Sequence, residues 1–360
     1  MQQFDPVTTS AAHRAVDAVW RIESAKIIAG VARMVRDVGV AEEIAQDALV
    51  AALEAWPASG VPDNPGAWLM ATAKHRAIDR LRQRQLHRGR EEALGYELDL
   101  RHEIATADFA AAVDAALDDD IGDDLLRLVF TACHPVLSME SRVALTLRLL
   151  GGLTTDVIAR AFLVGEPTVA QRIVRAKRTL AEAHVPFEVP RAVEPAERLA
   201  SVLEVIYLIF NEGYSATAGA DWMRRELCEE ALRQGRILAE LVPAASEVHG
   251  LVALMEIQAS RARARIGPAG EPVLLLEQNR ARWDRLLIRR GLAALGRAAA
   301  LGGAFGPYAL QAAIAACHAR ALTPEATDWP RIAALYDALA ELAPSPVVEL
   351  NRAVAVAMAF

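Results

Sequence analysis

The residues best suited to reading a nucleic acid lie in the segment PTVAQRIVRAKRTL, residues 167–180. Gln171 and Arg175 are four positions apart, so a helix places them on the same side. A glutamine can form paired hydrogen bonds with adenine, and an arginine can do the same with guanine. Ala170 and Val174 on that side can contact thymine methyl groups. The pattern predicts a helix that reads bases in the DNA major groove.

The same segment carries groups for the DNA backbone. Arg172, Lys177 and Arg178 can contact phosphates, and the free amides near Thr168 at the helix start suit an anion. The preceding stretch TTDVIARAF predicts a short helix with a threonine cap, and Gly165 supplies a turn before the next helix opens on a proline. A short helix, a turn and a second helix with a basic outer face predict a helix-turn-helix motif.

A second group of residues suited to nucleic acid lies nearer the N-terminus. Residues 74–90 hold seven Lys and Arg against one Asp, and Trp68 precedes them, off the apolar stripe of the predicted helix. An unstacked base can lie on an aromatic ring, which contributes roughly 1–3 kcal/mol, while cations contact the backbone beside it. Core packing of Trp68 and a solvated charge run are the alternatives. The cations placed for phosphate are Lys74, Arg76, Arg80, Arg82 and Arg84.

The elements that must position these residues are helices. The 360 residues are 53% hydrophobic and only 5% aromatic, and good helix formers fill nearly every segment. No run alternates β-branched or aromatic residues with polar ones, as a half-buried strand would. We therefore predict an all-α protein of two or three domains.

Several functional classes lack residues to support them. The three cysteines are far apart and form no CxxC pair, so we expect neither a metal site nor a disulfide framework. We find no glycine-rich phosphate loop and no catalytic constellation, so we expect no enzyme and no cofactor. The N-terminus shows no leader, and the longest apolar run, residues 202–210, contains Glu204 and is too short for a bilayer. We expect a cytoplasmic protein with no membrane contact.

Charge changes sign along the chain and suggests its division. The net charge is −7, yet residues 91–124 alone hold twelve acids against one arginine. We interpret this stretch as an acidic linker. The predicted organisation is a helical block at residues 10–90, the linker at 91–122, the helix-turn-helix block at 123–186, and a C-terminal helical block at 195–360.

The C-terminal block contains a weak internal repeat. PYALQAAIAACHA, residues 307–319, is similar to VVELNRAVAVAMA, residues 347–359, at a spacing of 40. Helix-pair repeats of this size predict a tetratricopeptide-like array, which we expect to continue beyond Phe360. Residues 191–360 carry 18 basic and 19 acidic side chains, a net charge of −1. Near-neutral, alanine-rich helices favour contact with protein over contact with DNA.

Two of these segments resemble a known family when taken together. The stretch AEEIAQDALVAALEAWP…NPGAWLMATAKHRAIDRLRQ resembles region 2 of bacterial RNA polymerase sigma factors of the extracytoplasmic-function type. The stretch GLTTDVIARAFLVGEPTVAQRIVRAKRTL resembles their region 4. Region 3 is missing, as in that type. The C-terminal block resembles the tetratricopeptide-like extension of one subgroup.

The resemblance implies partners and assigns roles. Region 2 would bind the β′ clamp helices of core RNA polymerase and the −10 promoter element, and region 4 would bind the −35 element near the β flap. Asp63 and Asn64 lie in a turn that resembles the loop capturing a flipped −10 base, and Trp68 follows it. Carboxylates facing the polymerase would suit a basic partner surface, although a plain solvated helix face is the alternative. The polymerase-binding positions would be Glu43, Gln46, Asp47, Val50 and Glu54.

Three functions are compatible with these patterns. The first is a sigma factor regulated by its C-terminal block, through a signalling protein or an intramolecular contact. The second is a one-component helix-turn-helix regulator with a helical sensor domain, which would need only one DNA-reading helix. The third is a tetratricopeptide scaffold with incidental basic segments. Both motifs in the order of the family favour the first.

Overall fold

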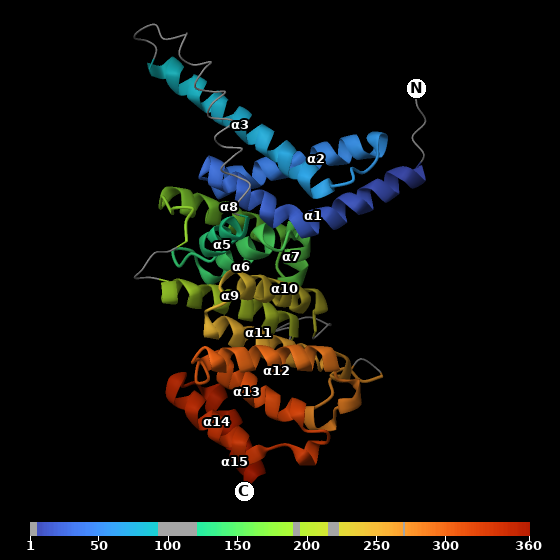
Figure 1. Ribbon diagram of the computed structural model, residues 1–360, viewed down its shortest axis with the longest axis vertical. Helices are drawn as coiled ribbons and strands as arrows, with labels where there is room; N and C mark the ends of the chain where they lie inside the picture. Colours follow the sequence, from blue (N-terminus) through green and yellow to red (C-terminus); the bar gives the residue numbers. More distant parts are fainter. Residues whose placement is uncertain (1–5, 93–120, 190–194, 215–222, 269–270) are drawn as a thin grey trace. The chain divides into compact units, whose positions relative to one another are not determined.

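The computed structural model describes residues 6–92, 121–189, 195–214, 223–268 and 271–360 (Figure 1). These residues confirm the predicted all-α class, because the β-pairing found among them is a single isolated bridge between Ile266 and Pro272. The chain divides into two compact units, Met1–Val202 and Leu203–Phe360. The acidic linker predicted at residues 91–122 falls almost entirely outside the described residues.

The first unit begins with a bundle of long helices whose ends are set by capping residues. The carboxylate of Asp37 accepts a hydrogen bond from the Val40 amide and starts the second helix, which ends at Gly60 with φ of 85°. The side chain of Asn64 accepts from the Ala67 amide and starts the third helix. These helices are α1 (Pro6–Val35), α2 (Val38–Ser59) and α3 (Pro65–Glu92).

Apolar stripes hold this bundle together, as the sequence predicted. Both α1 and α3 pack against α2. In α3 the periodicity predicts a stripe of Met70, Ala73, Ala77 and Leu81. Ala73 and Ala77 are buried, whereas Met70 and Leu81 are half-buried, and the buried Leu69 joins the stripe one turn before Ala73. In α2 the helical periodicity predicts one core face, and all of its residues are buried except Leu49, which is half-buried: Ile44, Ala45, Ala48, Leu49, Ala52 and Trp56.

The rest of the first unit consists of shorter helices that form the predicted helix-turn-helix block. Ser138 caps one of them by accepting from the Ser141 amide. A further helix, α9 (Pro195–Tyr214), begins in this unit, and its Ser201 hydroxyl donates to the Cys133 carbonyl at 2.8 Å. The block comprises α5 (Ile121–Ala132), α6 (Met139–Leu149), α7 (Thr155–Phe162) and α8 (Glu166–Glu182).

The second unit is a succession of helices that pack on their neighbours along the chain. Helix α11 contacts α10, α12 and α13, and α14 contacts α13 and α15. Arg280 is buried within this unit, and its guanidinium donates hydrogen bonds to the carbonyls of His318 and Ala321, both at 2.8 Å. The helices are α10 (Arg225–Leu241), α11 (Ser246–Ala259), α12 (Arg285–Ala300), α13 (Pro307–Arg320), α14 (Trp329–Leu342) and α15 (Pro346–Ala359), with short 3-10 turns at Ala262–Ala264, Leu275–Glu277, Arg280–Arg282 and Pro324–Ala326.

Among the described helices, none has both the length and the apolar character needed to cross a membrane. The helical nature of the C-terminal block is confirmed, and its tetratricopeptide-like repeat stays a prediction.

Candidate nucleic-acid interface

Helix α8 has the two-faced character that the sequence predicted. The helical periodicity predicts that Val169, Ile173, Ala176 and Leu180 face inward, and all four are buried. Gln171, Val174 and Arg175 face solvent, and Val174 keeps 64% of its area exposed although it is apolar. An exposed valine between a glutamine and an arginine is suited to a groove that offers methyl groups and hydrogen-bonding edges.

The turn before α8 differs from the prediction in one detail. Leu163, not Gly165, adopts the left-handed conformation, with φ of 50°. Gly165 has φ of −65° and serves as the residue that caps α8. The left-handed Leu163 amide closes α7 by donating to the Arg160 carbonyl at 3.4 Å. The helix-turn-helix geometry therefore arises without a glycine at its strained position.

The cations predicted for phosphate on α8 are not equivalent. Arg178 is exposed and pairs with Glu182 on its own helix at 3.2 Å, whereas Arg172 is half-buried. Lys177 forms an ion pair with Glu42, a carboxylate whose side chain is only 4% exposed. In this conformation Lys177 is paired with Glu42 and does not face outward, while Arg175 and Arg178 lie on the outer face of α8.

Glu42 is the centre of a buried polar cluster that the sequence analysis missed. Its carboxylate also pairs with Arg148 of α6 at 2.6 Å and accepts a hydrogen bond from Gln46 at 2.5 Å. The cluster joins α2 to α6 and α8, and a second pair, Arg33 with the buried Asp124 at 3.3 Å, joins α1 to α5. A signal existed in the sequence, since Glu42 lies three residues before Ala45 on the apolar side of α2.

The acidic positions predicted to face the polymerase lie beside the basic positions predicted to face DNA. Across the contact between α2 and α3, Asp47 pairs with Arg76 at 3.7 Å and Glu43 with Arg80 at 4.0 Å. All four side chains are more than 40% exposed, so these long pairs can exchange for other partners at little cost. Val50 and Glu54 are also exposed, and Gln46 is turned toward Glu42.

The structure shows how the proposed base-stacking residue is supported. Trp68 is half-buried and meets the buried Trp56 edge to face, with ring centroids 5.6 Å apart. Trp68 is therefore packed against Trp56 while the residue as a whole stays partly exposed. Asp63 and Asn64 are exposed at the start of α3. Of the basic side chains along α3, Lys74 is half-buried and the others are exposed: Arg76, Arg80, Arg82 and Arg84.

A helix-turn-helix whose second helix exposes a polar reading face defines a class of DNA-binding transcription proteins. Comparison with known proteins narrows this class. Three descriptions match successive parts of the chain: Sigma-70 region 2 at residues 23–87, Sigma-70 region 4 at 127–180, and a family of unknown function (DUF6596) at 198–299.

Several curated proteins are similar over longer stretches. "Uncharacterized protein R00370" of Rhizobium meliloti (strain 1021) is 47% identical over 329 residues, covering 90% of this chain and 75% of that protein. ECF RNA polymerase sigma factor SigK of Mycobacterium ulcerans (strain Agy99) is 32% identical over 155 residues, covering 42% of this chain and 75% of SigK. A protein described as "Probable ECF RNA polymerase sigma factor SigI", from Mycobacterium tuberculosis, is 29% identical over 197 residues, 55% of this chain and 60% of its own length. No solved structure matches the chain.

The chain belongs to the ECF RNA polymerase sigma factor family. Core RNA polymerase and promoter DNA are therefore its partners, and transcription initiation is its function.

Proposed function

We propose that this sigma factor reads both promoter elements with separate helices and that its second unit regulates it. Helix α8 would read the −35 element through Gln171 and Arg175. The start of α3 would hold a base of the −10 element on Trp68. The carboxylates of α2 would meet the β′ clamp helices, in the cytoplasm where the polymerase acts.

The observation that carries the proposal is the separation of the two faces of α8. All four predicted core residues are buried, whereas three of the four candidate base readers, Gln171, Val174 and Arg175, are exposed and the fourth, Ala170, is half-buried. A helix stabilised by one stripe leaves the opposite face free for DNA, so recognition requires no rearrangement inside the motif.

Transcription in vitro tests the proposal. Core polymerase would be supplied with the full chain or with residues 1–202, a fragment that keeps the hydrogen bond from Ser201 to Cys133. We expect promoter-dependent transcripts, and the ratio of the two yields gives the sign of regulation by residues 203–360. Equal yields would contradict the regulatory role.

A matched pair of variants tests the site itself. Gln171→Ala with Arg175→Ala should abolish transcription from a promoter that depends on its −35 element, whereas the exposed Arg160→Ala on α7 should preserve it. Sequence-specific binding to duplex DNA without polymerase association or transcripts would instead indicate a one-component regulator.

A further inference from the structure

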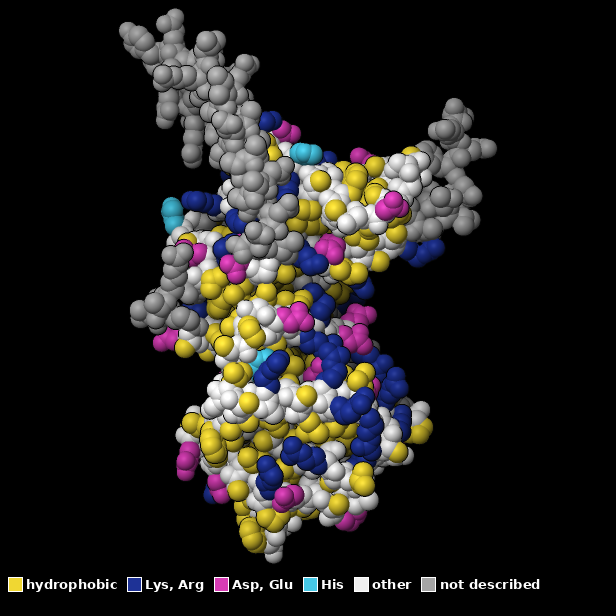
Figure 2. All heavy atoms as spheres, viewed as in Figure 1, with side chains coloured by type: hydrophobic (Ala, Val, Ile, Leu, Met, Phe, Trp, Pro, Cys, Tyr) yellow, Lys and Arg dark blue, Asp and Glu magenta, His cyan; other side chains and the backbone are white. Residues whose placement is uncertain are grey.

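The second unit concentrates its positive charge in one stretch of the chain, although its net charge is close to zero. Residues 261–297 hold nine arginines against three acids. Helix α12 contributes four of these arginines and contains no Asp or Glu. In Figure 2 dark-blue side chains collect on one flank of this unit. Near-neutrality therefore conceals a strongly basic surface.

Some of these arginines serve the fold and others do not. Arg280 is buried and satisfied by carbonyl groups, and Arg290 pairs with the buried Glu256 at 3.4 Å. In contrast, Arg282, Arg285 and Arg289 are exposed, and no ion pair involving them is found among the described residues. Arg297 is exposed further along α12. We call the exposed set, Arg282, Arg285, Arg289 and Arg297, the arginine face.

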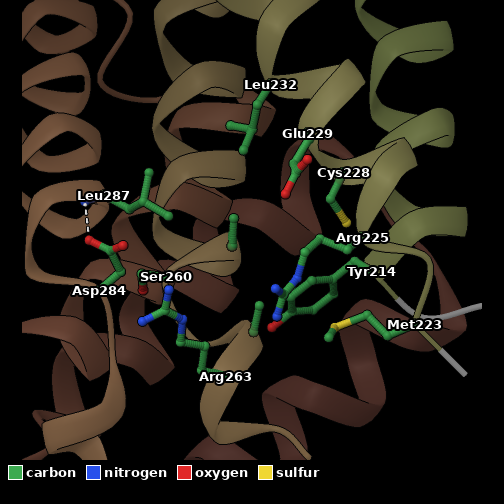
Figure 3. A pocket seen from close by; sticks show the side chains of 12 residues that line it. Tyr214, Met223, Arg225, Cys228, Glu229, Leu232, Ser260, Arg263, Asp284 and Leu287 are labelled. Carbon is green, nitrogen blue, oxygen red and sulfur yellow. Dashed lines mark hydrogen bonds between the residues drawn. The ribbon is translucent and has the colours of Figure 1, made fainter. Parts of the chain in front are cut away.

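The arginine face begins beside a pocket of about 160 Å³ between α10, α11 and the start of α12. Arg225 and Arg263 line this pocket, and Asp284 lies in it while accepting hydrogen bonds from the first amides of α12 (Figure 3). Glu229 and Asp284 together balance the charge of the two arginines in the pocket. The excess positive charge therefore lies outside the pocket, along α12.

The arginine face is not placed for helix stability. Arg285 occupies the first turn of α12, where the helix dipole disfavours a cation. Arg285 and Arg289 are four residues apart, a spacing at which like charges repel. Both effects are unfavourable in the free protein, and an anionic partner would reverse both.

The residues between the arginines indicate what kind of anion fits. Besides the arginines, the exposed side of α12 presents Ala293, Gly296, Ala299 and Ala300, with Leu286 as its large apolar residue. Protein interfaces have cores enriched in aromatic and large apolar side chains, of which this side of α12 offers only Leu286. Small residues between guanidinium groups let a helix approach a phosphodiester backbone closely.

We propose that the arginine face binds the phosphate backbone of duplex DNA without regard to sequence. This contact goes beyond the reading of the two promoter elements, since it would place a third DNA-binding surface in the second unit. It would raise affinity evenly across promoters.

Salt dependence of binding by the full chain tests the proposal without polymerase. A labelled 40-base-pair duplex of random sequence is titrated with wild type and with Arg282→Ala, Arg285→Ala and Arg289→Ala combined. Each lost phosphate contact lowers the slope of log affinity against log salt by about 0.9. Three contacts predict a slope smaller by about 3, so between 50 and 200 mM salt the wild type loses roughly 40-fold more affinity than the variant.

Matched variants separate this contact from a general charge effect. Arg320→Ala, Arg331→Ala and Arg352→Ala combined remove the same charge from α13, α14 and α15 and should keep the wild-type slope. Arg282→Lys, Arg285→Lys and Arg289→Lys combined keep the charge and should also preserve the wild-type slope. An unchanged slope in the α12 alanine variant would overturn the proposal. So would unchanged duplex binding with weaker binding to core polymerase, which would assign the face to an acidic protein surface.

Discussion

We predict that single residues on α8 divide into base readers and backbone contacts, and this division can be measured. Arg175→Ala removes a guanidinium that can pair with guanine and should cost roughly 1–3 kcal/mol of discrimination at one −35 base pair. Arg178→Ala should weaken binding about equally on all sequences, because a phosphate contact carries no sequence information. Binding to a panel of single-base −35 variants distinguishes the two. Parallel losses for both substitutions would contradict the assignment.

A single buried residue, His318, makes the stability of the second unit depend on pH. Burial, followed by the charges of Arg261 and Arg280, lowers the pKa of His318 to about 4. Its ring lies edge to face with Trp329 at 5.3 Å. Because the folded state keeps the ring neutral, the unfolded chain binds the extra proton as the pH falls below about 6.5. Stability is therefore lost between about pH 6.5 and pH 4.

The expected loss from this group is about 3 kcal/mol once the pH is below 4. His318→Phe keeps a ring beside Trp329 and cannot titrate, so its unfolding free energy should depend less on pH across that window. Urea unfolding at several pH values measures the difference, with the exposed His184→Asn as control. Identical pH profiles for wild type and His318→Phe would exclude the effect.

At the scale of helices, Glu42 connects α2 to α6 and α8. Removing one partner of a buried ion pair leaves uncompensated charge and typically costs about 3 kcal/mol or more. Glu42→Gln should therefore lower the unfolding free energy of the full chain by about that amount. Its neighbour Glu43 is exposed and reaches Arg80 only at 4.0 Å, so Glu43→Gln should change stability by less than about 0.5 kcal/mol. Equal changes in unfolding free energy for Glu42→Gln and Glu43→Gln would show that the buried cluster does not stabilise the fold.

Helix faces could be predicted from the sequence because they depend on local spacing. The stripe Val169, Ile173, Ala176 and Leu180 and most of the α2 stripe are buried as expected. The exposed side of α8 follows from the same periodicity. These parts of the fold and of the candidate site need only the 3.6-residue repeat and a choice of the apolar side.

Other features depend on which helices meet, and local spacing does not determine that. Glu42 pairs with Arg148, which lies 106 positions further along the chain, and no periodic pattern specifies this pairing. The sequence predicts that Lys177 contacts phosphate, yet in the structure Lys177 pairs with Glu42. The arginine face was overlooked because opposite charges elsewhere in the unit cancel it in the total.

At the scale of the whole molecule, the first unit holds α3 and α8, the helices predicted to read the promoter, close together on α2. Helices α3 and α8 both contact α2, a helix of 22 residues and therefore about 33 Å long. The −35 and −10 elements lie roughly 25 base pairs apart, which is about 85 Å of duplex at 3.4 Å per pair. Helix α8 must leave α2 for both elements to be read at once.

A reversible covalent link between α2 and α8 tests this requirement. A Cβ atom at Gly39 would lie 3.7 Å from the Cβ of Lys177, close to the separation in a disulfide. Gly39→Cys with Lys177→Cys should therefore form a bond that holds α8 on α2. The native Cys133, Cys228 and Cys317 are buried, and burial raises the pKa of the Cys133 thiol to about 11 and that of Cys228 to about 12, so they should stay inert.

The oxidised variant should bind core polymerase but give at least tenfold fewer transcripts from a promoter with both elements, and a reductant should restore them. Lys177→Cys alone controls for the loss of the ion pair with Glu42, and its activity should not respond to the reductant. Full transcription by the verified disulfide form would mean that both elements are read without separating α8 from α2. The mechanism argued from the promoter spacing would then be wrong, whereas the base-reading role of Arg175 would stand on its own test.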